Sequence, residues 1–345
     1  MTGTNGDLRV LGQDAVAAIL AGRERDVVER VRAAYVAHRR GETSLPHSTF
    51  LRFPGRKRER IIALPAYLGG EAQVAGIKWI ASFPDNVSRG VARASATILL
   101  NDVETGRPHT LLEGGLISAT RTAASAALAG RVLHPEADPP VGLVGGGRIN
   151  FEIVHYLHTL LPRIPQWRLF DLDAARGREF AERCCEAFPG VTVELATSLD
   201  ELLRSSRLVS FATTAVDPYL DDPSACSPGT TLLHVSLRDL TAKAMLTDGV
   251  DHVVDDLDHV CRAQTSIHLA AEEIGHRDFV RAEIGAVLTG EAEARPDPRG
   301  ITVFSPFGLG ILDLVLAEWI TREARDRELG TLVSGFLSDT AGSWG

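Results

Sequence analysis

The apolar residues of the first 40 positions recur with the spacing of a helix, so this segment is predicted to be helical. One helix is expected to follow a cap at Asp14, and a second spans about Glu24 to Arg39. From His47 to Leu100 apolar and polar residues alternate instead, which is typical of strands that bury one face. Asn101 to Gly106 predicts a turn between two strands. We therefore expect this first region to be a mostly antiparallel α+β unit.

A second pattern begins after an Ala-rich helix predicted from Leu116 to Leu133. Short apolar runs then alternate with helical segments, which favours a parallel sheet. The predicted strands are Val141–Val144, Arg168–Leu172, Val191–Leu195, Leu208–Thr213, Thr231–Ser236 and His252–Asp255. Residues 262–290 are expected to be helical, and residues 301–304 form a further strand. A last helix, from about Ile311 to Glu328, has an apolar face that we expect to pack back on the first region.

Composition narrows the class of protein. The net charge of -9 argues against nucleic acid or an anionic membrane as a partner, and Arg56-Lys57-Arg58 is interpreted as a solvated loop. No run of about 18 apolar residues predicts a membrane span. The four cysteines lack a C-x-x-C spacing, which predicts neither a disulfide framework nor a metal site. With no apolar signal segment at the N-terminus, we expect a cytoplasmic protein.

The stretch V-G-L-V-G-G-G-R-I-N, from Val141 to Asn150, joins an apolar strand through glycines to a helix. This order is typical of the start of a doubly wound nucleotide-binding domain. Gly145 suits the tight turn, and Gly147 lets the backbone approach a pyrophosphate at the helix N-terminus. The fingerprint departs from its usual form at Asn150, where glycine or alanine is expected.

Asp171 ends the second strand of this region, near the offset of about 20 residues expected for an acid that binds ribose. A carboxylate there accepts hydrogen bonds from the ribose hydroxyls and repels a 2′-phosphate, which favours NAD over NADP. Arg176 lies close by in the sequence and weakens that preference. The alternative is that Asp171 caps the next helix, and both roles are compatible.

Later strand ends carry further candidates. Thr213 ends one strand in F-A-T-T-A, at the edge where ligands bind in such sheets, although turn chemistry alone also explains it. Arg238 and Asp239 follow the next strand, where a partly desolvated carboxylate with its pKa raised toward neutrality suits a general base. A structural ion pair is the alternative. Neither the histidine pair His155 and His158 nor the acidic group Asp255, Asp256 and Asp258 is interpreted as a metal site.

Cations within the strands of the first region point to an anionic ligand. Lys78 in G-I-K-W-I and Arg52 in F-L-R-F lie in apolar strands, and a buried cation needs an anionic partner. A substrate carboxylate fits this need, whereas a solvent-facing position is the alternative, more so for Arg52. Arg121 and Thr122, in S-A-T-R-T-A-A-S, are candidates for a pyrophosphate clamp.

The chain resembles the ornithine cyclodeaminase/μ-crystallin family over nearly its whole length. The matching stretches include G-I-K-W, I-S-A-T-R-T-A-A-S, the glycine turn, S-L-R-D-L and F-S-P-F-G-L-G-I-L-D-L. The resemblance implies an α/β protein with a Rossmann-type doubly wound NAD-binding domain at 121–311. It also implies an α+β substrate-binding and dimerisation domain at 1–120 and 312–345, a homodimer, and a small amino-acid substrate.

Within the family the chain resembles a branch of NAD-dependent dehydrogenases that act on N-(2-amino-2-carboxyethyl)-L-glutamate. Signatures of this branch are K-W-I-A-S-F-P-D-N, G-G-R-I-N-F-E, S-L-R-D-L and A-Q-T-S. Asn150 fits this branch. The resemblance implies cleavage of that substrate to 2,3-diaminopropionate and 2-oxoglutarate, for siderophores or peptide natural products. Ornithine cyclodeaminase, a ketimine or imino-acid reductase, and a non-catalytic binder are the alternatives.

The resemblance assigns roles to individual positions. Asp239 and Lys78 are expected to be catalytic, and Arg52, Lys78 and Arg238 to bind the substrate. The cofactor-binding positions are expected to be Arg121, Thr122, Gly145, Gly147, Arg148, Ile149, Asp171, Thr213, Ser236, Ser305 and Gly308. Cyclodeaminases carry a glutamate in the strand leading to Pro65, where this chain is aligned with Ala63. The usual K-S before the last helix is Ser305-Pro306 here, so a hydroxyl contact there falls to Ser305.

Overall fold

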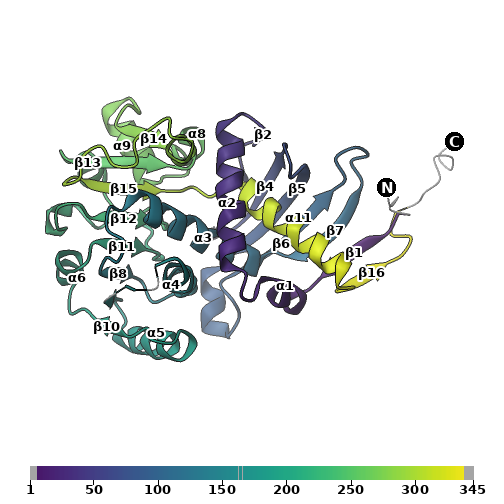
Figure 1. Cartoon of the computed structure of the whole chain (residues 1–345), viewed down its shortest axis with the longest axis horizontal. Helices are drawn as coiled ribbons and strands as arrows, with labels where there is room; N and C mark the ends of the chain where they lie inside the picture. Colours follow the sequence, from purple (N-terminus) through teal and green to yellow (C-terminus); the bar gives the residue numbers. More distant parts are fainter. Residues whose placement is uncertain (1–5, 162, 165, 338–345) are drawn as a thin grey trace. The chain divides into compact units, whose positions relative to one another are not determined.

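A computed structural model describes residues 6–161, 163–164 and 166–337. The chain divides into two compact units: unit 1 comprises Met1–Arg121 and Leu309–Gly345, and unit 2 comprises Thr122–Gly308. The sequence placed these boundaries at 120/121 and 311/312. The chain passes from unit 1 to unit 2 within helix α3 (Gly115–Leu133) and returns just before helix α11 (Gly310–Asp326) (Figure 1).

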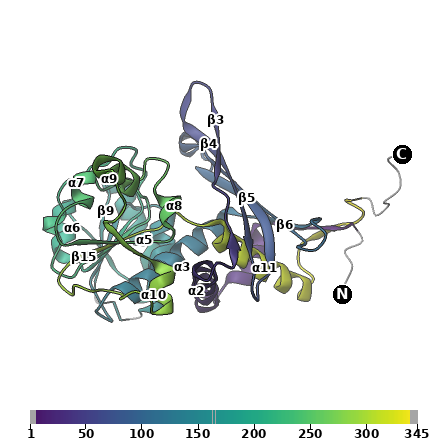
Figure 2. The same cartoon turned by 90° about the horizontal axis from the view of Figure 1, so that it is seen from above.

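Unit 1 is built on an eight-stranded sheet in which neighbours are antiparallel, except for the parallel pair β1–β7. In spatial order the strands are β16 (Thr331–Val333), β1 (Leu8–Leu11), β7 (Pro108–Glu113), β6 (Ala94–Asn101), β5 (Val74–Ser82), β4 (Arg56–Leu68) and β2 (Thr43–Ser44), with β3 (Thr49–Phe53) also paired to β4. The β3–β4 hairpin extends beyond the rest of the sheet (Figure 2). A short 3₁₀ helix, η1 (Pro84–Arg89), follows β5.

Three helices cover one face of this sheet: α1 (Gln13–Leu20), α2 (Glu24–Arg39) and α11. The helix α11 is buried along most of its length, because its apolar residues face both the sheet and α2. Gly310 permits the close approach, since a Cβ there would lie 3.2 Å from the Cβ of Ala66. The predicted packing of the last helix on the first region is confirmed.

Local predictions for unit 1 needed three corrections. Helix α1 is preceded by Gly12 at its N-cap, not capped by Asp14. Residues 8–11 form a strand within the segment expected to be helical, because pairing with β7 and β16 outweighs local propensity. Arg56 begins β4 instead of lying in a solvated loop. Its backbone pairs with Phe53 across the hairpin, an arrangement that leaves charged side chains in water.

Strand alternation gives the unit 1 sheet two chemically different faces. Lys78 lies opposite Leu64 and Ile98 in the strand register, so it shares the face that α11 covers. Its neighbour Trp79 belongs to the other face. Large apolar side chains are exposed on this second face: Leu51 (46%), Tyr67 (39%) and Trp79 (43%).

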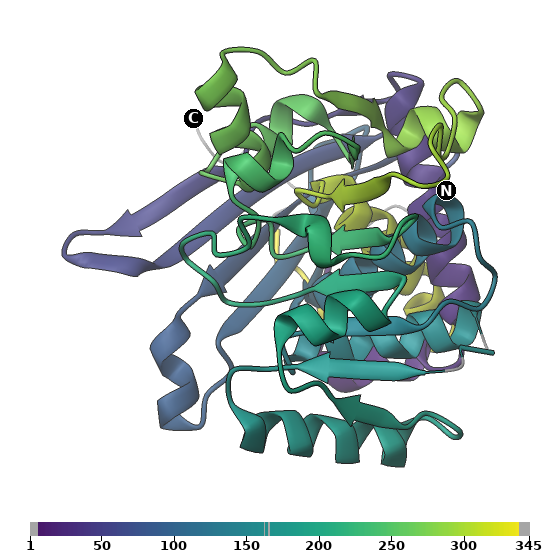
Figure 3. The ribbon, with the colours of Figure 1, turned by 90° about the vertical axis from the view of Figure 1, so that its left-hand side faces the viewer.

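Unit 2 is a parallel sheet of the Rossmann type (Figure 3). In spatial order its strands are β10 (Val193–Leu195), β9 (Trp167–Phe170), β8 (Val141–Val144), β11 (Leu208–Phe211), β12 (Thr231–His234), β15 (Ile301–Ser305), β13 (Val250–Val254) and β14 (Val280–Glu283). The chain starts at β8, runs outward through β9 and β10, and returns to β11 on the other side of β8. The topological switch point, where such sheets bind ligands, therefore lies between β8 and β11.

The helices of unit 2 lie between its strands in sequence. They are α4 (Arg148–Leu160), α5 (Ala174–Ala187), α6 (Leu199–Ser205), η2 (Pro223–Ala225), α7 (Ala242–Met245), α8 (Leu257–Val260), α9 (Ser266–Ile274) and α10 (Ile284–Thr289). The segment 262–290, predicted to be helical throughout, is interrupted: Gly275 ends α9 in a left-handed conformation, and β14 then joins the sheet beside β13. No helix among the described residues has the length and hydrophobicity to cross a bilayer.

Candidate active site

The glycine turn lies at the switch point of unit 2. Gly145 has a φ of +95°, and a Cβ there would lie 2.8 Å from the carbonyl oxygen of Ala212, so both strain and space require glycine. Around Gly147, by contrast, a Cβ would meet nothing within 4 Å. Gly147 is the N-cap of α4 and offers no side chain to its free N–H groups, and Arg148 and Ile149 begin the helix. This open helix N-terminus suits a pyrophosphate.

Asp171 supports the same turn from the adjacent strand end. Its Oδ2 accepts a hydrogen bond from the Gly146 N–H at 2.7 Å, and its Oδ1 accepts one from the Asp173 N–H at 2.9 Å. The N-cap of α5 is Asp173, whose carboxylate accepts from the N–H groups of Ala175 and Arg176. The capping alternative considered for Asp171 thus belongs to Asp173. Asp171 lies beside the glycine turn, and its predicted contact with the ribose of a dinucleotide stays a prediction.

Asn150 explains why the fingerprint departs from its usual form. Its side chain is fully buried and donates to the carbonyl oxygens of Val144 at 2.9 Å and Gly145 at 2.7 Å. Its Oδ1 accepts a hydrogen bond from the Ser210 hydroxyl at 2.7 Å. The side chain therefore ties the glycine turn to β11, which a glycine or an alanine at this position cannot do.

Asp239 lies beyond the end of β12 with its side chain completely buried. Three hydroxyls surround the carboxylate: Thr213 Oγ1 lies 2.5 Å and Tyr219 Oη 3.0 Å from Oδ1, and Ser236 donates to Oδ2. The sequence named Thr213 and Ser236 as cofactor contacts, and the structure places both on Asp239. No sequence pattern pointed to Tyr219, because only the fold brings it to this carboxylate. Its backbone N–H also donates to the Asp239 carbonyl, at 3.0 Å.

A buried histidine lies behind this carboxylate. His234 Nε2 is 3.3 Å from Asp239 Oδ2 and 3.1 Å from the Asp239 backbone nitrogen, and its Nδ1 is 3.2 Å from the Ser305 hydroxyl. Burial alone would raise the pKa of Asp239, but the hydrogen bonds from His234, Ser236 and Thr213 outweigh it and lower that pKa below its ordinary value. The expectation of a pKa raised toward neutrality is wrong.

Three other predicted positions of unit 2, Arg238, Gly308 and Ser305, make hydrogen bonds within the protein. Arg238 donates a hydrogen bond from Nη2 to the carbonyl of Ala263 at 2.5 Å. The Gly308 N–H donates to Asp255 at 2.7 Å, so this carboxylate fixes the turn that leads to α11. Burial raises the pKa of Asp255 to about 6. Ser305 is fully buried, with its hydroxyl directed to His234.

Unit 1 contributes a cluster of buried charges around Lys78. Lys78 Nζ lies 2.6 Å from Asp313 Oδ2 and 3.3 Å from the Ser118 hydroxyl. Arg121 Nε lies 3.2 Å from the other oxygen of the same carboxylate. Lys78 is 1% exposed and Asp313 is fully buried, whereas the Arg121 side chain retains 11% exposure. Arg121, expected at a phosphate, therefore shares its partner with Lys78.

The charges in this cluster do not balance. Lys78 and Arg121 carry two positive charges when protonated, and Asp313 supplies one negative charge. Burial, together with the positive charge of Arg121, lowers the pKa of Lys78 to about 8, although Asp313 acts in the opposite direction. A monoanion beside Lys78 and Arg121 would balance the cluster, and a carboxylate has the appropriate charge and geometry.

Arg52 is not brought to this cluster. It lies on the exposed β3–β4 hairpin, where its guanidinium lies 5.4 Å from the ring centre of Phe50. In the strand register it is opposite Arg60, which is opposite Ser82, whereas Lys78 is opposite Leu64. That register separates the two backbones by roughly 15–20 Å, two strands across and four residues along. A role for Arg52 in substrate binding stays a prediction.

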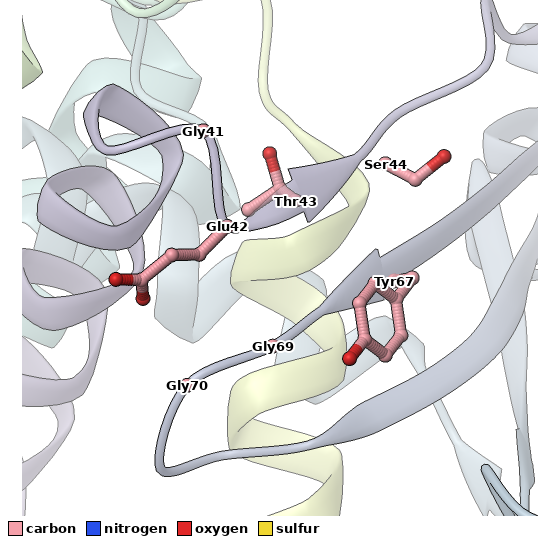
Figure 4. Close-up of a pocket in the computed structure, with 7 residues that line it drawn as sticks. All are labelled: Gly41, Glu42, Thr43, Ser44, Tyr67, Gly69 and Gly70. Atoms are coloured by element: carbon pink, nitrogen blue, oxygen red, sulfur yellow. The ribbon is translucent and has the colours of Figure 1, made fainter.

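Unit 1 also contains a hollow between the end of α2 and the β4–β5 turn (Figure 4). Its lining residues are Gly41, Glu42, Thr43, Ser44, Tyr67, Gly69 and Gly70. It offers one carboxylate and no cation, so it lacks the paired charges found around Lys78. Among the described residues no group of three or more His, Cys, Asp or Glu side chains is arranged to hold a metal ion.

Known proteins are similar to this chain in sequence and fold. The model of the ornithine cyclodeaminase/mu-crystallin family matches residues 14–328. N-((2S)-2-amino-2-carboxyethyl)-L-glutamate dehydrogenase of Staphylococcus aureus is 28% identical over 313 residues, which cover 89% of this chain and 92% of that protein. The crystal structure of CmnK is 30% identical, with a TM-score of 0.84 over 98% of this chain and 100% of that chain.

A third similar protein is Δ(1)-pyrroline-2-carboxylate reductase of Thermococcus litoralis, solved in complex with NADH and L-proline. It is 23% identical to this chain and has a TM-score of 0.85 over 94% of this chain and 99% of that chain. At this identity the likeness is one of fold, and it extends over both units.

Proposed function

Because the chain belongs to the ornithine cyclodeaminase/mu-crystallin family, we propose that it is an NAD-dependent oxidoreductase acting on the CH–NH bond of an N-substituted amino acid. We propose further that its substrate is N-(2-amino-2-carboxyethyl)-L-glutamate, cleaved to L-2,3-diaminopropionate and 2-oxoglutarate. The similarity to the Staphylococcus aureus dehydrogenase supports this substrate. The observation that carries the proposal is the buried cluster of Lys78, Arg121 and Asp313, whose excess positive charge suits a substrate carboxylate.

The residues around the glycine turn fit NAD. The open space at Gly147 and the uncapped N-terminus of α4 suit the pyrophosphate, with Arg148 and Ile149 in the first turn. Asp171 suits the ribose hydroxyls and disfavours a 2′-phosphate. When bound, NAD⁺ supplies the hydride acceptor for the oxidation of the substrate carbon. We propose that Thr122, Thr213, Ser236, Ser305 and Gly308 also belong to the cofactor-binding set.

The charged side chains suit the two ends of such a substrate. We propose that Lys78 and Arg121 hold a carboxylate next to the carbon that is oxidised, with Arg238 and Arg52 as candidates for the remaining carboxylates. The anionic Asp239, kept ionised by its hydrogen bonds, stabilises the positive charge that develops on the substrate nitrogen as the imine forms. Water then adds to the imine carbon, and the carbon–nitrogen bond breaks.

Ornithine cyclodeaminase activity is the alternative within the family, and the β4 strand argues against it. Ala63, aligned with the expected glutamate, lies opposite Trp79 and so faces away from Lys78. On the Lys78 face, the β4 residues nearest to Lys78 are Ile62, Leu64 and Ala66, which are all apolar, and Arg60 lies further along the strand. This segment therefore supplies no carboxylate to the Lys78 cluster, whichever residue is aligned with the glutamate.

A homodimer is the assembly that we propose, formed through the apolar face of the unit 1 sheet. Leu51, Tyr67 and Trp79 are each more than a third exposed on this face, an unusual arrangement for a surface that meets only water. We propose the cytoplasm as the compartment, since the reaction draws on NAD⁺ and the four cysteines are free thiols. Siderophore or peptide natural-product synthesis is the proposed destination of the diaminopropionate.

The substrate assignment is tested by incubating the enzyme and NAD⁺ separately with N-(2-amino-2-carboxyethyl)-L-glutamate, L-ornithine, L-proline and L-alanine. The proposal expects NADH absorbance to rise with the first compound and to be at least tenfold slower with the others. No NADH from the N-linked glutamate, or equal rates with proline, would reject the substrate. Ammonia released from ornithine without net NADH would establish the cyclodeaminase alternative.

A further inference from the structure

Hydroxyl groups cover both oxygens of the Asp239 carboxylate. It is 0% exposed, and the hydroxyls of Thr213, Tyr219 and Ser236 occupy its two oxygens. Hydrogen bonds from hydroxyls stabilise the ionised form of a carboxylate, so Asp239 keeps its charge despite its burial. A proton that ends on Asp239 must therefore pass through one of the hydroxyl groups that cover it.

Two of these hydroxyls are committed to the backbone. The Ser236 hydroxyl lies 3.0 Å from the Phe211 carbonyl oxygen, which competes with Asp239 for its proton. The Thr213 hydroxyl accepts a hydrogen bond from the Ala215 N–H at 3.1 Å. Both residues closely follow buried strands, Thr213 after β11 and Ser236 after β12, so their backbones are held in place by the sheet.

Tyr219 differs from them in its exposure and its anchoring. The residue is 43% exposed, whereas the carboxylate that its hydroxyl contacts is fully buried. Its backbone N–H donates to the Asp239 carbonyl, so both the main chain and the side chain of Tyr219 are hydrogen-bonded to Asp239. Burial and the charge of Asp239 raise the pKa of Tyr219, so the phenol stays protonated and donates to the carboxylate.

We propose that Tyr219 is the catalytic residue of the hydrolytic step, passing a proton from the attacking water to Asp239. This inference rests on the proposed function. Hydride loss leaves the imine protonated on nitrogen, and as the water oxygen bonds to its carbon, one O–H bond of the water breaks and the proton moves to the phenol oxygen. The phenol gives its own proton to Asp239 Oδ1, and the electron pair of the C=N bond moves to nitrogen. The product is the carbinolamine, and Tyr219 ends the step neutral.

The test uses the full-length enzyme, NAD⁺ and N-(2-amino-2-carboxyethyl)-L-glutamate in rapid-quench single turnovers of the wild type and of Tyr219→Phe. NADH and 2-oxoglutarate are measured separately, and sodium borodeuteride added at the quench reduces any accumulated imine to deuterated substrate. We expect Tyr219→Phe to form NADH within about threefold of the wild-type rate. Release of 2-oxoglutarate should slow about 100-fold or more, with deuterium in the recovered substrate.

The NADH phase in the same experiment controls for folding and for cofactor binding. Asp217→Asn, an exposed substitution in the segment that carries Tyr219, should leave both phases unchanged. Release of 2-oxoglutarate by Tyr219→Phe at the wild-type rate would overturn the inference and leave the proposed function standing. Faster release would mean that the phenol only shields Asp239 from water. Equal slowing of both phases would mean that Tyr219 does not act specifically in the hydrolytic step. Either result would overturn the inference. Absence of NADH from the wild type would instead overturn the proposed function itself.

Discussion

Asp313 accepts a hydrogen bond from Lys78 at 2.6 Å, although 235 positions separate the two residues in the chain. The contact forms because α11 returns to the covered face of the unit 1 sheet and presents its first turn to β5. The same carboxylate holds Arg121. In our account Asp313 thus positions two cations for one substrate carboxylate.

We expect Asp313→Asn to lower kcat/KM at least tenfold and to shift its pH profile. The Lys78 ammonium exists below its pKa of about 8, so kcat/KM of the wild type should fall as the pH rises through that value. Without the carboxylate the ammonium is less stable, which moves this alkaline limb to lower pH. Asp326→Asn, an exposed substitution on the same helix, should leave the limb in place. An unchanged limb in Asp313→Asn would contradict the assigned role.

Asp171 and Asp173 lie two positions apart and should separate cofactor selection from helix capping. Asp171→Ala should weaken NAD⁺ binding about tenfold, the equivalent of about 1.4 kcal/mol, with a smaller effect on NADP⁺. Asp173→Ala removes the α5 cap and should cost about 0.5–2 kcal/mol of stability without changing the preference between the nucleotides. Calorimetric titration and thermal unfolding measure the two effects. Similar changes in nucleotide preference for both variants would refute the ribose assignment.

The Asn150→Gly substitution would bring the sequence nearer to the common fingerprint, yet we expect it to destabilise the protein. It removes the buried hydrogen bonds to the Val144 and Gly145 carbonyls and to the Ser210 hydroxyl, at a cost of about 1–3 kcal/mol. Ser210→Ala removes one of these bonds and should cost less. Urea unfolding monitored by fluorescence checks the order. A glycine variant as stable as the wild type would show that the Asn150 hydrogen bonds do not stabilise the glycine turn.

How far the sequence predicted the site depends on how local each interaction is. The glycine turn and Asp171 follow from short-range spacing, because strand, turn and helix are contiguous. Thr213, Ser236 and Asp239 could be grouped because the carboxyl ends of parallel strands meet at one edge of a sheet. Their shared hydrogen bonds, and the lowered pKa of Asp239, depend on atomic distances that spacing does not give.

Interactions across long stretches of chain were beyond a pattern analysis. Asp313 was part of a recognised stretch, but nothing in the sequence predicted its contacts with Lys78 and Arg121. Tyr219 lies in a segment between strands that has no helical or strand periodicity, so the sequence does not predict which residue its phenol contacts. The start of β4 at Arg56 was missed for a different reason: pairing with the neighbouring strand β3, and not local hydrophobicity, creates the strand there.

Trp79 tests the proposed dimer. It is 43% exposed on the apolar face of the unit 1 sheet, so Trp79→Glu places a charge on that face without disturbing the covered one. We expect the wild type to sediment as a dimer and the variant as a monomer at micromolar concentration, with the fold retained by circular dichroism. The control substitution Val87→Glu, at an exposed position in η1, should leave the sedimentation unchanged. A dimeric Trp79→Glu would locate the contact elsewhere.

Product stoichiometry shows whether one enzyme both oxidises and hydrolyses the N-linked glutamate substrate. The substrate and excess NAD⁺ are incubated to completion, and NADH, 2-oxoglutarate, 2,3-diaminopropionate and ammonia are quantified in the same sample. We expect equal amounts of NADH, 2-oxoglutarate and 2,3-diaminopropionate, and no ammonia. Ammonia in place of 2-oxoglutarate, or 2-oxoglutarate formed without an equal amount of NADH, would contradict this expectation.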